Sequence, residues 1–71
     1  MMIKNYKFQF CNVELSVTEV DDGKSIVIEG ISNLPYVSVW RAADFLCKNN
    51  YNTSLRSGRV EFYARCIIVN L

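Results

Sequence analysis

Apolar and polar residues alternate with a period of two through the first thirty residues, a pattern typical of β-strands. The alternation is interrupted twice, at Cys11-Asn12 and at Asp22-Gly23. Asn, Asp and Gly adopt turn conformations more readily than other residues, so each interruption predicts a turn between two strands. The expected strands are residues 3–10, 13–20 and 24–30.

The Asp-Gly dipeptide favours a two-residue type I′ turn. Such a turn pairs Val17 with Ile28 and Leu15 with Gly30. The apolar side chains of this hairpin then share one side, namely Leu15, Val17, Ile26 and Ile28. A three-residue loop would place them on both faces, which a half-buried sheet does not tolerate.

The first interruption changes the parity of the apolar positions. They are even-numbered before it, at Tyr6, Phe8 and Phe10, and odd-numbered after it, from Val13 onward. A tight turn at Cys11-Asn12 would pair Phe10 with Val13, whereas a bulge in one bent strand would also reset the parity. We favour the turn, which gives a three-stranded antiparallel meander.

The hydrophobic period changes to that of a helix after Pro35. Ser38 is the expected N-cap, and Asn49-Asn50 the expected end, of a helix over residues 38–49. At 100° per residue, one arc of this helix collects the core-facing side chains. They are Val39, Trp40, Ala42, Ala43, Leu46 and Cys47.

The last segment returns to a strand pattern. A turn at Ser57-Gly58 would pair Leu55 with Val60, and one strand would then continue from Arg59 to Val69. The end of this strand is apolar on both faces, so we expect it in the middle of the sheet or covered by the helix or another subunit. The order βββαββ predicts a single α+β domain over residues 1–71, with one amphipathic helix packed on a mainly antiparallel sheet.

Length and composition limit the possible chemistry. The chain of 71 residues is too short for two cores, and 51% hydrophobic with 21% charged residues argues against disorder. There is no His, no glycine-rich phosphate loop, and the three cysteines lack metal-ligand spacing. We therefore expect a protein that is not an enzyme and needs no cofactor or metal.

The cysteines and the apolar runs also bear on location. An odd number of widely spaced cysteines is typical of a reduced chain, and the sequence opens without the pattern of a secretory leader. No apolar run approaches the roughly 20 residues that a membrane-spanning helix needs. A cytoplasmic protein with no membrane role is the expectation.

Basic residues gather in the second half of the chain, where five Lys and Arg face two acids, although the net charge is only +1. Aromatic residues such as Phe62 and Tyr63 lie between them. Cations with stacking rings are what a single-stranded nucleic acid requires. The candidate nucleic-acid-binding residues are Lys48, Tyr51, Arg56, Arg59 and Arg65.

Apolar groups outside the expected core point to a protein partner instead. Phe45 falls outside the core arc of the helix, between Arg41 and Asn49, and Trp40 lies at the margin of that arc. Aromatic and Arg side chains are enriched at interface hot spots, so Trp40, Arg41 and Phe45 are the predicted anchors.

The favoured function is therefore a small protein that binds and occludes a protein partner, in the manner of the inhibitors and accessory factors that phages and mobile elements encode. The alternative is a nucleic-acid-binding regulator that uses the basic half. Open sheet edges also make self-association into a homo-oligomer possible.

Overall fold

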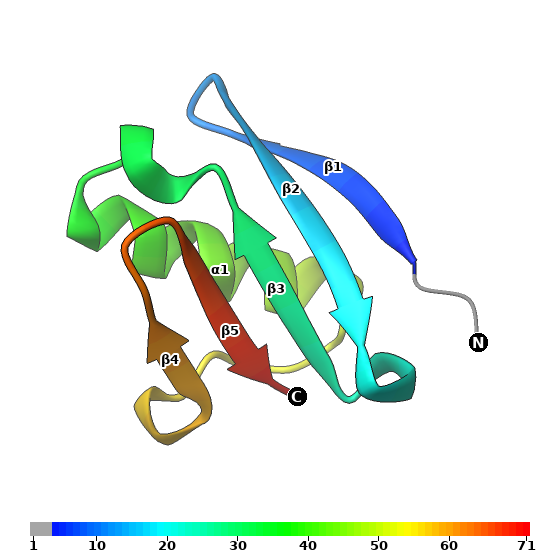
Figure 1. Cartoon of the computed structure of the whole chain (residues 1–71). Helices are drawn as coiled ribbons and strands as arrows, with labels where there is room; N and C mark the ends of the chain where they lie inside the picture. Colours follow the sequence, from blue (N-terminus) through cyan, green and yellow to red (C-terminus); the bar gives the residue numbers. More distant parts are fainter. Residues whose placement is uncertain (1–3) are drawn as a thin grey trace.

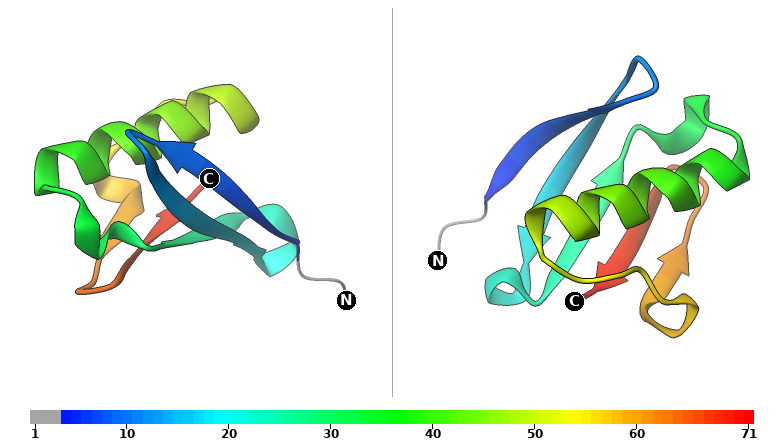
Figure 2. Two further views of the ribbon diagram at one scale, coloured as in Figure 1. Left: turned by 90° about the horizontal axis from the view of Figure 1, so that it is seen from above. Right: turned by 180° about the vertical axis from the view of Figure 1, so that it is seen from behind.

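The computed structural model describes residues 4–71 and has two layers, a five-stranded antiparallel sheet and one helix that covers one of its faces (Figures 1 and 2). The elements are β1 (Asn5–Phe10), β2 (Val13–Val20), β3 (Ser25–Glu29), α1 (Tyr36–Asn50), β4 (Val60–Phe62) and β5 (Cys66–Asn70). The strand order across the sheet is β1-β2-β3-β5-β4. The predicted α+β class and the order βββαββ are confirmed. Residue 3 of the predicted first strand lies outside the described residues.

The N-terminal meander has the predicted register. Phe10 pairs with Val13, and Cys11 and Asn12 both have positive φ angles, of 52° and 63°. Two consecutive residues with positive φ make a type I′ turn, so the alternative of a bulge in one bent strand is wrong. The rings of β1 therefore face the same side as the core residues of β2.

The second hairpin also follows the prediction. Val17 pairs with Ile28, and the Lys24 N–H donates to the Asp21 carbonyl at 3.1 Å. Asp22 and Gly23 have φ angles of 56° and 84°, as a type I′ turn requires. Asp21 also has a positive φ angle, of 52°, which the pattern did not predict.

The helix begins two residues earlier than predicted. Ser38 is not the N-cap, because Pro35 occupies that position and its carbonyl accepts the first helical hydrogen bond, from the Val39 N–H at 3.0 Å. Proline disfavours a helical conformation in the residue before it, so Leu34 is extended and the helix starts directly after the proline. Tyr36 and Val37 consequently belong to the first turn of α1.

The helix ends close to the predicted place. Its last residue is Asn50, and Asn52 then adopts a φ angle of 51° while the Thr53 N–H returns to the Cys47 carbonyl at 3.3 Å. Asn is one of the few residue types that accept this left-handed conformation, so an asparagine does terminate the helix, two positions after its last residue.

The C-terminal pairing differs from the prediction. Residues 53–55 form no strand, and the run from Arg59 to Val69 is a hairpin instead of one strand, with Val60 opposite Val69. The Tyr63 N–H donates to the Cys66 carbonyl at 2.9 Å and closes a turn at Ala64-Arg65. This turn reverses the chain, so β5 can lie between β3 and β4, in the middle of the sheet as one alternative predicted.

The core lies between the sheet and the helix. Its buried residues are Leu15, Val17, Ile26, Ile28, Ile31, Val39, Ala42, Ala43, Leu46, Cys47, Ile67 and Val69. Every member of the predicted helical arc is in this set except Trp40, which is half-buried. Within the described residues, α1 is too short to cross a bilayer.

Candidate functional site

The first turns of α1 lie beside the β4–β5 hairpin at one end of the molecule (Figure 2). Exposed aromatic side chains from both elements contact one another there. We call this the aromatic surface and define it by Tyr36, Trp40, Phe62 and Tyr63. Tyr36 is 67% exposed and Tyr63 is 52% exposed. Large apolar groups that remain in solvent together mark binding surfaces more often than single exposed ones.

The rings of the aromatic surface hold one another in place. The Tyr36 and Phe62 ring centroids are 5.2 Å apart, and Trp40 stacks on Phe62 at 6.1 Å with an interplanar angle of 18°. The Tyr63 hydroxyl donates to the Glu61 carboxylate at 2.9 Å, and this contact raises the pKa of Tyr63. Because the rings are already ordered by these contacts, a partner would order few further side chains when it binds.

A groove opens beside these rings and reaches the edge of the core. Its volume is about 340 Å³. The loop before the helix, the helix itself and the β4–β5 hairpin contribute its lining, namely Ile31, Ser32, Leu34, Tyr36, Val39, Phe62, Tyr63 and Ala64. The groove is thus mainly apolar and suits an apolar side chain from a partner.

Phe45 occupies the opposite flank of the helix. It is 50% exposed, and its ring contacts Phe8 and Phe10 at centroid distances of 5.9 and 6.1 Å. These contacts are with β1, at the other edge of the sheet from β4. Phe45 therefore both packs against the fold and leaves half of its surface in solvent.

The structure divides the three predicted protein-binding anchors. Arg41 and Phe45 are four residues apart on one exposed stripe of α1, and Val37 precedes them by the same spacing. Trp40 faces Phe62 on the other flank. Trp40 and Phe45 therefore do not form one patch.

The predicted nucleic-acid-binding residues are also spread over the molecule. Lys48 pairs with Asp44 at 3.1 Å, and the Tyr51 hydroxyl bonds to Glu19 at 2.7 Å. Arg56 precedes the short 3₁₀ turn Ser57–Arg59 and Arg59 ends it, at one end of β4, whereas Arg65 lies in the turn at the other end of β4.

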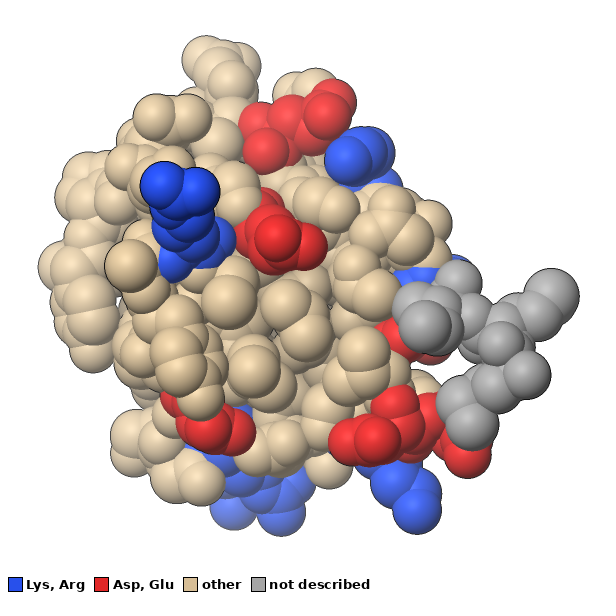
Figure 3. Space-filling view, in the orientation of Figure 1, with Lys and Arg blue, Asp and Glu red and all other residues tan. Residues whose placement is uncertain are grey.

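The charges on the uncovered face of the sheet are mixed. Figure 3 looks onto this face and shows Lys and Arg side chains interspersed with Asp and Glu, without one continuous basic surface. Nucleic-acid affinity depends on several cations that act on one backbone. Neither the pairing of Lys48 nor this distribution adds to the case for a nucleic-acid surface.

Possible metal ligands and cysteine thiols are scattered over residues 4–71. Within residues 4–71, no three His, Cys, Asp or Glu residues lie close enough together to hold a metal ion. All three cysteines are free, and burial, together with the nearby Asp44 charge, raises the pKa of the Cys47 thiol. A thiol of this kind is a poor nucleophile.

Sequence reasoning missed Tyr36 as a surface residue and treated Phe62 as part of a regular alternating strand. The missed signal for Tyr36 was Pro35, which permits a helix to start directly after it.

Comparisons of the chain with protein-family models, with curated proteins and with solved structures find no match.

Proposed function

We propose that this protein acts without catalysis, by binding another protein through the aromatic surface and occluding the partner's own site. The observation that carries the proposal is that three of the exposed aromatic rings among residues 4–71, those of Tyr36, Phe62 and Tyr63, line one apolar groove. Tyr, Trp and Arg dominate interface hot spots, and the rims of interfaces are polar. Arg65 lies in the turn that follows Tyr63 and supplies a polar group at such a rim.

The aromatic surface can bury more apolar area against one partner than Phe45 alone can. Burying the ring of one exposed aromatic residue contributes about 1.5–3 kcal/mol through the hydrophobic effect. Tyr36, Phe62 and Tyr63 can be covered together by one partner, whereas Phe45 projects from the other flank. Of the three predicted anchors we therefore retain Trp40, which stacks on Phe62, and add the rings of Tyr36, Phe62 and Tyr63.

We also propose that the protein works in the cytoplasm. The support is chemical, since Cys11, Cys47 and Cys66 are all free thiols, as is usual for proteins in a reducing compartment. Cys11 is exposed in a turn and would be open to oxidation elsewhere.

The test is capture of partners from the native cell, with and without nuclease treatment, followed by affinity measurements on the captured protein. The double variant Tyr36→Ser/Tyr63→Ser is expected to lose at least about 2 kcal/mol of binding free energy, roughly a thirtyfold weaker Kd. Phe45→Ser is the matched control, because it removes a ring of similar exposure from the opposite flank.

Two outcomes would contradict the proposal. Loss of binding in Phe45→Ser but not in the double variant would place the interface on the Phe45 flank of the helix and not on the aromatic surface. Capture that disappears after nuclease treatment and in an Arg56→Gln/Arg59→Gln variant would identify the protein as the nucleic-acid-binding regulator of the alternative interpretation.

A further inference from the structure

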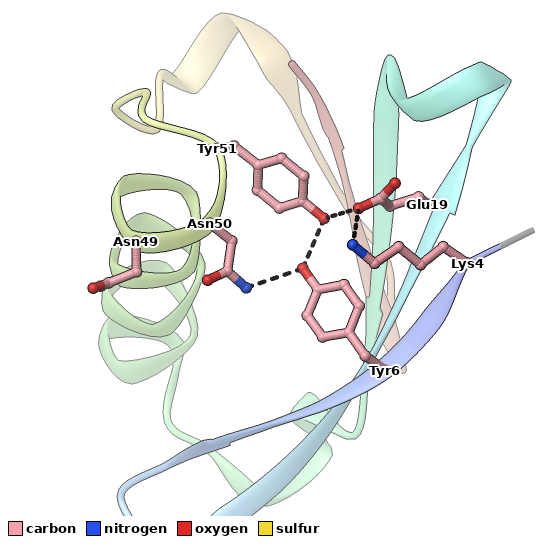
Figure 4. A pocket seen from close by; sticks show the side chains of 6 residues that line it. All are labelled: Lys4, Tyr6, Glu19, Asn49, Asn50 and Tyr51. Carbon is pink, nitrogen blue, oxygen red and sulfur yellow. Dashed lines mark hydrogen bonds and ion pairs between the residues drawn. The ribbon is translucent and has the colours of Figure 1, made fainter.

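A second, polar pocket lies at the other end of the helix from the aromatic surface (Figure 4). Its volume is about 450 Å³. The start of β1, the end of β2 and the C-terminal end of α1 provide its lining, namely Lys4, Tyr6, Glu19, Asn49, Asn50 and Tyr51. In Figure 4 all of these side chains except Asn49 take part in one chain of polar contacts, and Asn49 points away from it.

The hydrogen bonds in this chain run in one direction. The Asn50 amide donates to the Tyr6 hydroxyl at 3.2 Å, and the Tyr51 hydroxyl donates to Glu19 Oε2 at 2.7 Å. The two hydroxyls are 2.7 Å apart, so Tyr6 donates to Tyr51, whose own proton is already directed at Glu19. Both hydroxyl dipoles therefore point toward the carboxylate and support its negative charge.

Glu19 stands at an unusual position for a carboxylate. Its partner across the sheet is the buried Ile26, so Glu19 belongs to the row of β2 that faces the helix. Its side chain is only 20% exposed. A negative charge in such surroundings favours a cation beside it.

Lys4 supplies a cation to the pocket, but its contacts are loose. Its ammonium is 3.7 Å from Glu19 Oε2 and 5.5 Å from the centroid of the Tyr6 ring, while the Lys4 side chain remains 68% exposed. A carboxylate and an aromatic face around one ammonium are the two elements of cation recognition. Exposed ion pairs of this kind contribute little to stability, so the ammonium can leave at small cost.

We infer that this pocket is a binding site for an alkylammonium group, such as the end of a lysine side chain or of a polyamine, and that Lys4 occupies it in the free protein. The incoming ammonium takes the place of the Lys4 ammonium, beside Glu19 and over the Tyr6 ring. The site is assembled in advance, because Tyr51 and Asn50 fix the carboxylate and the ring independently of Lys4. This inference does not depend on the aromatic surface.

The test is an NMR titration with n-butylammonium chloride at constant ionic strength, with 1-butanol as the neutral control of the same shape. The signals of the Asn50 side-chain amide and the Tyr51 backbone amide report on the pocket. With butylammonium we expect chemical-shift changes that saturate with a Kd on the order of 10 mM, because one small cation makes few contacts. With 1-butanol we expect no changes.

Two variants separate the parts of the site. Lys4→Met removes the competing ammonium while keeping a long side chain. It is expected to tighten butylammonium binding about two- to sixfold, because a surface ion pair of ordinary strength keeps the pocket occupied by Lys4 to that extent. Glu19→Gln keeps an acceptor for the Tyr51 hydroxyl but removes the charge, and it is expected to abolish the shifts. Titrations with Nα-acetyl-lysine N-methylamide, whose side-chain ammonium is free, and with spermidine then compare the two sources. Tighter binding of the first indicates a protein lysine as the ligand, and tighter binding of spermidine indicates a polyamine.

Unchanged or weaker butylammonium binding in Lys4→Met would overturn the inference, as would equal shifts with 1-butanol. Should Glu19→Gln fail to fold, the Lys4→Met comparison still decides the question. Retained binding in a folded Glu19→Gln protein would also contradict the assignment of the carboxylate.

Discussion

The two edges of the sheet both carry aromatic rings that pack against the helix, yet they expose these rings to different degrees. At the β1 edge, Phe8 and Phe10 are half-buried and share Phe45 as their contact on the helix. At the β4 edge, Phe62 is 39% exposed and its partner Tyr36 is more exposed still.

The difference follows from the lengths of the two edge strands. β1 has six residues and continues into a two-residue turn, so its rings cover the flank of the helix, whereas β4 has only three residues. A short edge strand cannot cover the first turns of α1, and rings from both elements remain in solvent. The rings of β1 are thus more buried than those at the β4 edge, and we propose that the β4 edge is the one that binds a partner.

Removing one ring from each edge tests this difference most strongly. Phe8→Ala is expected to lower the free energy of unfolding by about 2–3 kcal/mol, because its ring packs against both the core and Phe45. Phe62→Ala is expected to cost about 1 kcal/mol, since much of its ring is already in solvent. Urea denaturation at pH 7 measures both values, and equal losses would remove the distinction between the edges.

The hydrogen bonds of Tyr51 with Tyr6 and Glu19, near β1, are expected to make the next largest contribution to the free energy of unfolding. Tyr51→Phe removes two hydrogen bonds and is expected to cost about 1 kcal/mol. Burial and the contacts with Tyr6 and Glu19 raise the pKa of Tyr51 far above its ordinary value of 10.0. The unfolded chain therefore ionises first, so the stability of the native protein should fall as the pH rises above 10.

The control for this effect is the slope of stability against pH. Tyr51→Phe should show a shallower decline above pH 10 than the native protein, because it lacks the group that titrates differently in the two states. Parallel slopes in the two proteins would mean that Tyr51 is not held in its neutral form by the fold.

A hydrogen bond that attaches the segment before β4 to the helix contributes less to stability. The Leu55 N–H donates to Asp44 at 3.0 Å, and this bond, followed by the Lys48 side chain, lowers the pKa of Asp44 below 3.8. A lowered pKa stabilises the fold above pH 3.8, and that stabilisation is lost as the pH falls through the lowered value.

Asp44→Asn retains an acceptor for Leu55 but loses the charge. We expect a loss of about 0.5 kcal/mol at pH 7, and a difference from the native protein that shrinks below pH 3.8. Denaturation series at pH 7 and pH 2.5 measure this. A difference that is constant across the series would assign the effect to geometry and not to charge.

The smallest expected effect is at Tyr36. Tyr36→Ala should change the free energy of unfolding by less than about 0.5 kcal/mol, because two thirds of the side chain is already solvated. The same thermal or urea measurement checks it. A loss as large as that of Phe8→Ala would show that Tyr36 is a structural residue and would leave the aromatic surface without its most exposed ring.

The sequence predicted the N-terminal meander well because its turns contain residues that accept positive φ. Asn12 and Gly23 mark the reversals, and the parity of the flanking apolar residues fixes the register. Local chemistry and the burial pattern therefore agreed there.

The C-terminal hairpin was not predictable in the same way. Its turn at Ala64-Arg65 contains no Gly, Asn, Asp or Pro, whereas Ser57-Gly58 resembles a hairpin turn but forms a 3₁₀ turn instead. The parity change between Phe62 and Ile67 was hidden because Ala64 and Cys66 are themselves apolar.

The same error concealed the candidate site. In a single long strand, Phe62 lies on one face with Ala64, far from any helix start, and nothing brings it to Tyr36. The two rings meet only because the chain reverses after β4 and because the helix starts at residue 36. A juxtaposition of this kind depends on tertiary pairing, which a single sequence does not encode locally.

We propose that the β4 edge, and not the β1 edge, meets the partner. This is tested most directly by placing the photo-crosslinker p-benzoylphenylalanine at position 63 in one variant and at position 45 in another, and irradiating both in the native cell. We predict a discrete protein adduct from position 63 and none from position 45. A discrete adduct from position 45 alone would show that the partner meets the β1 edge instead.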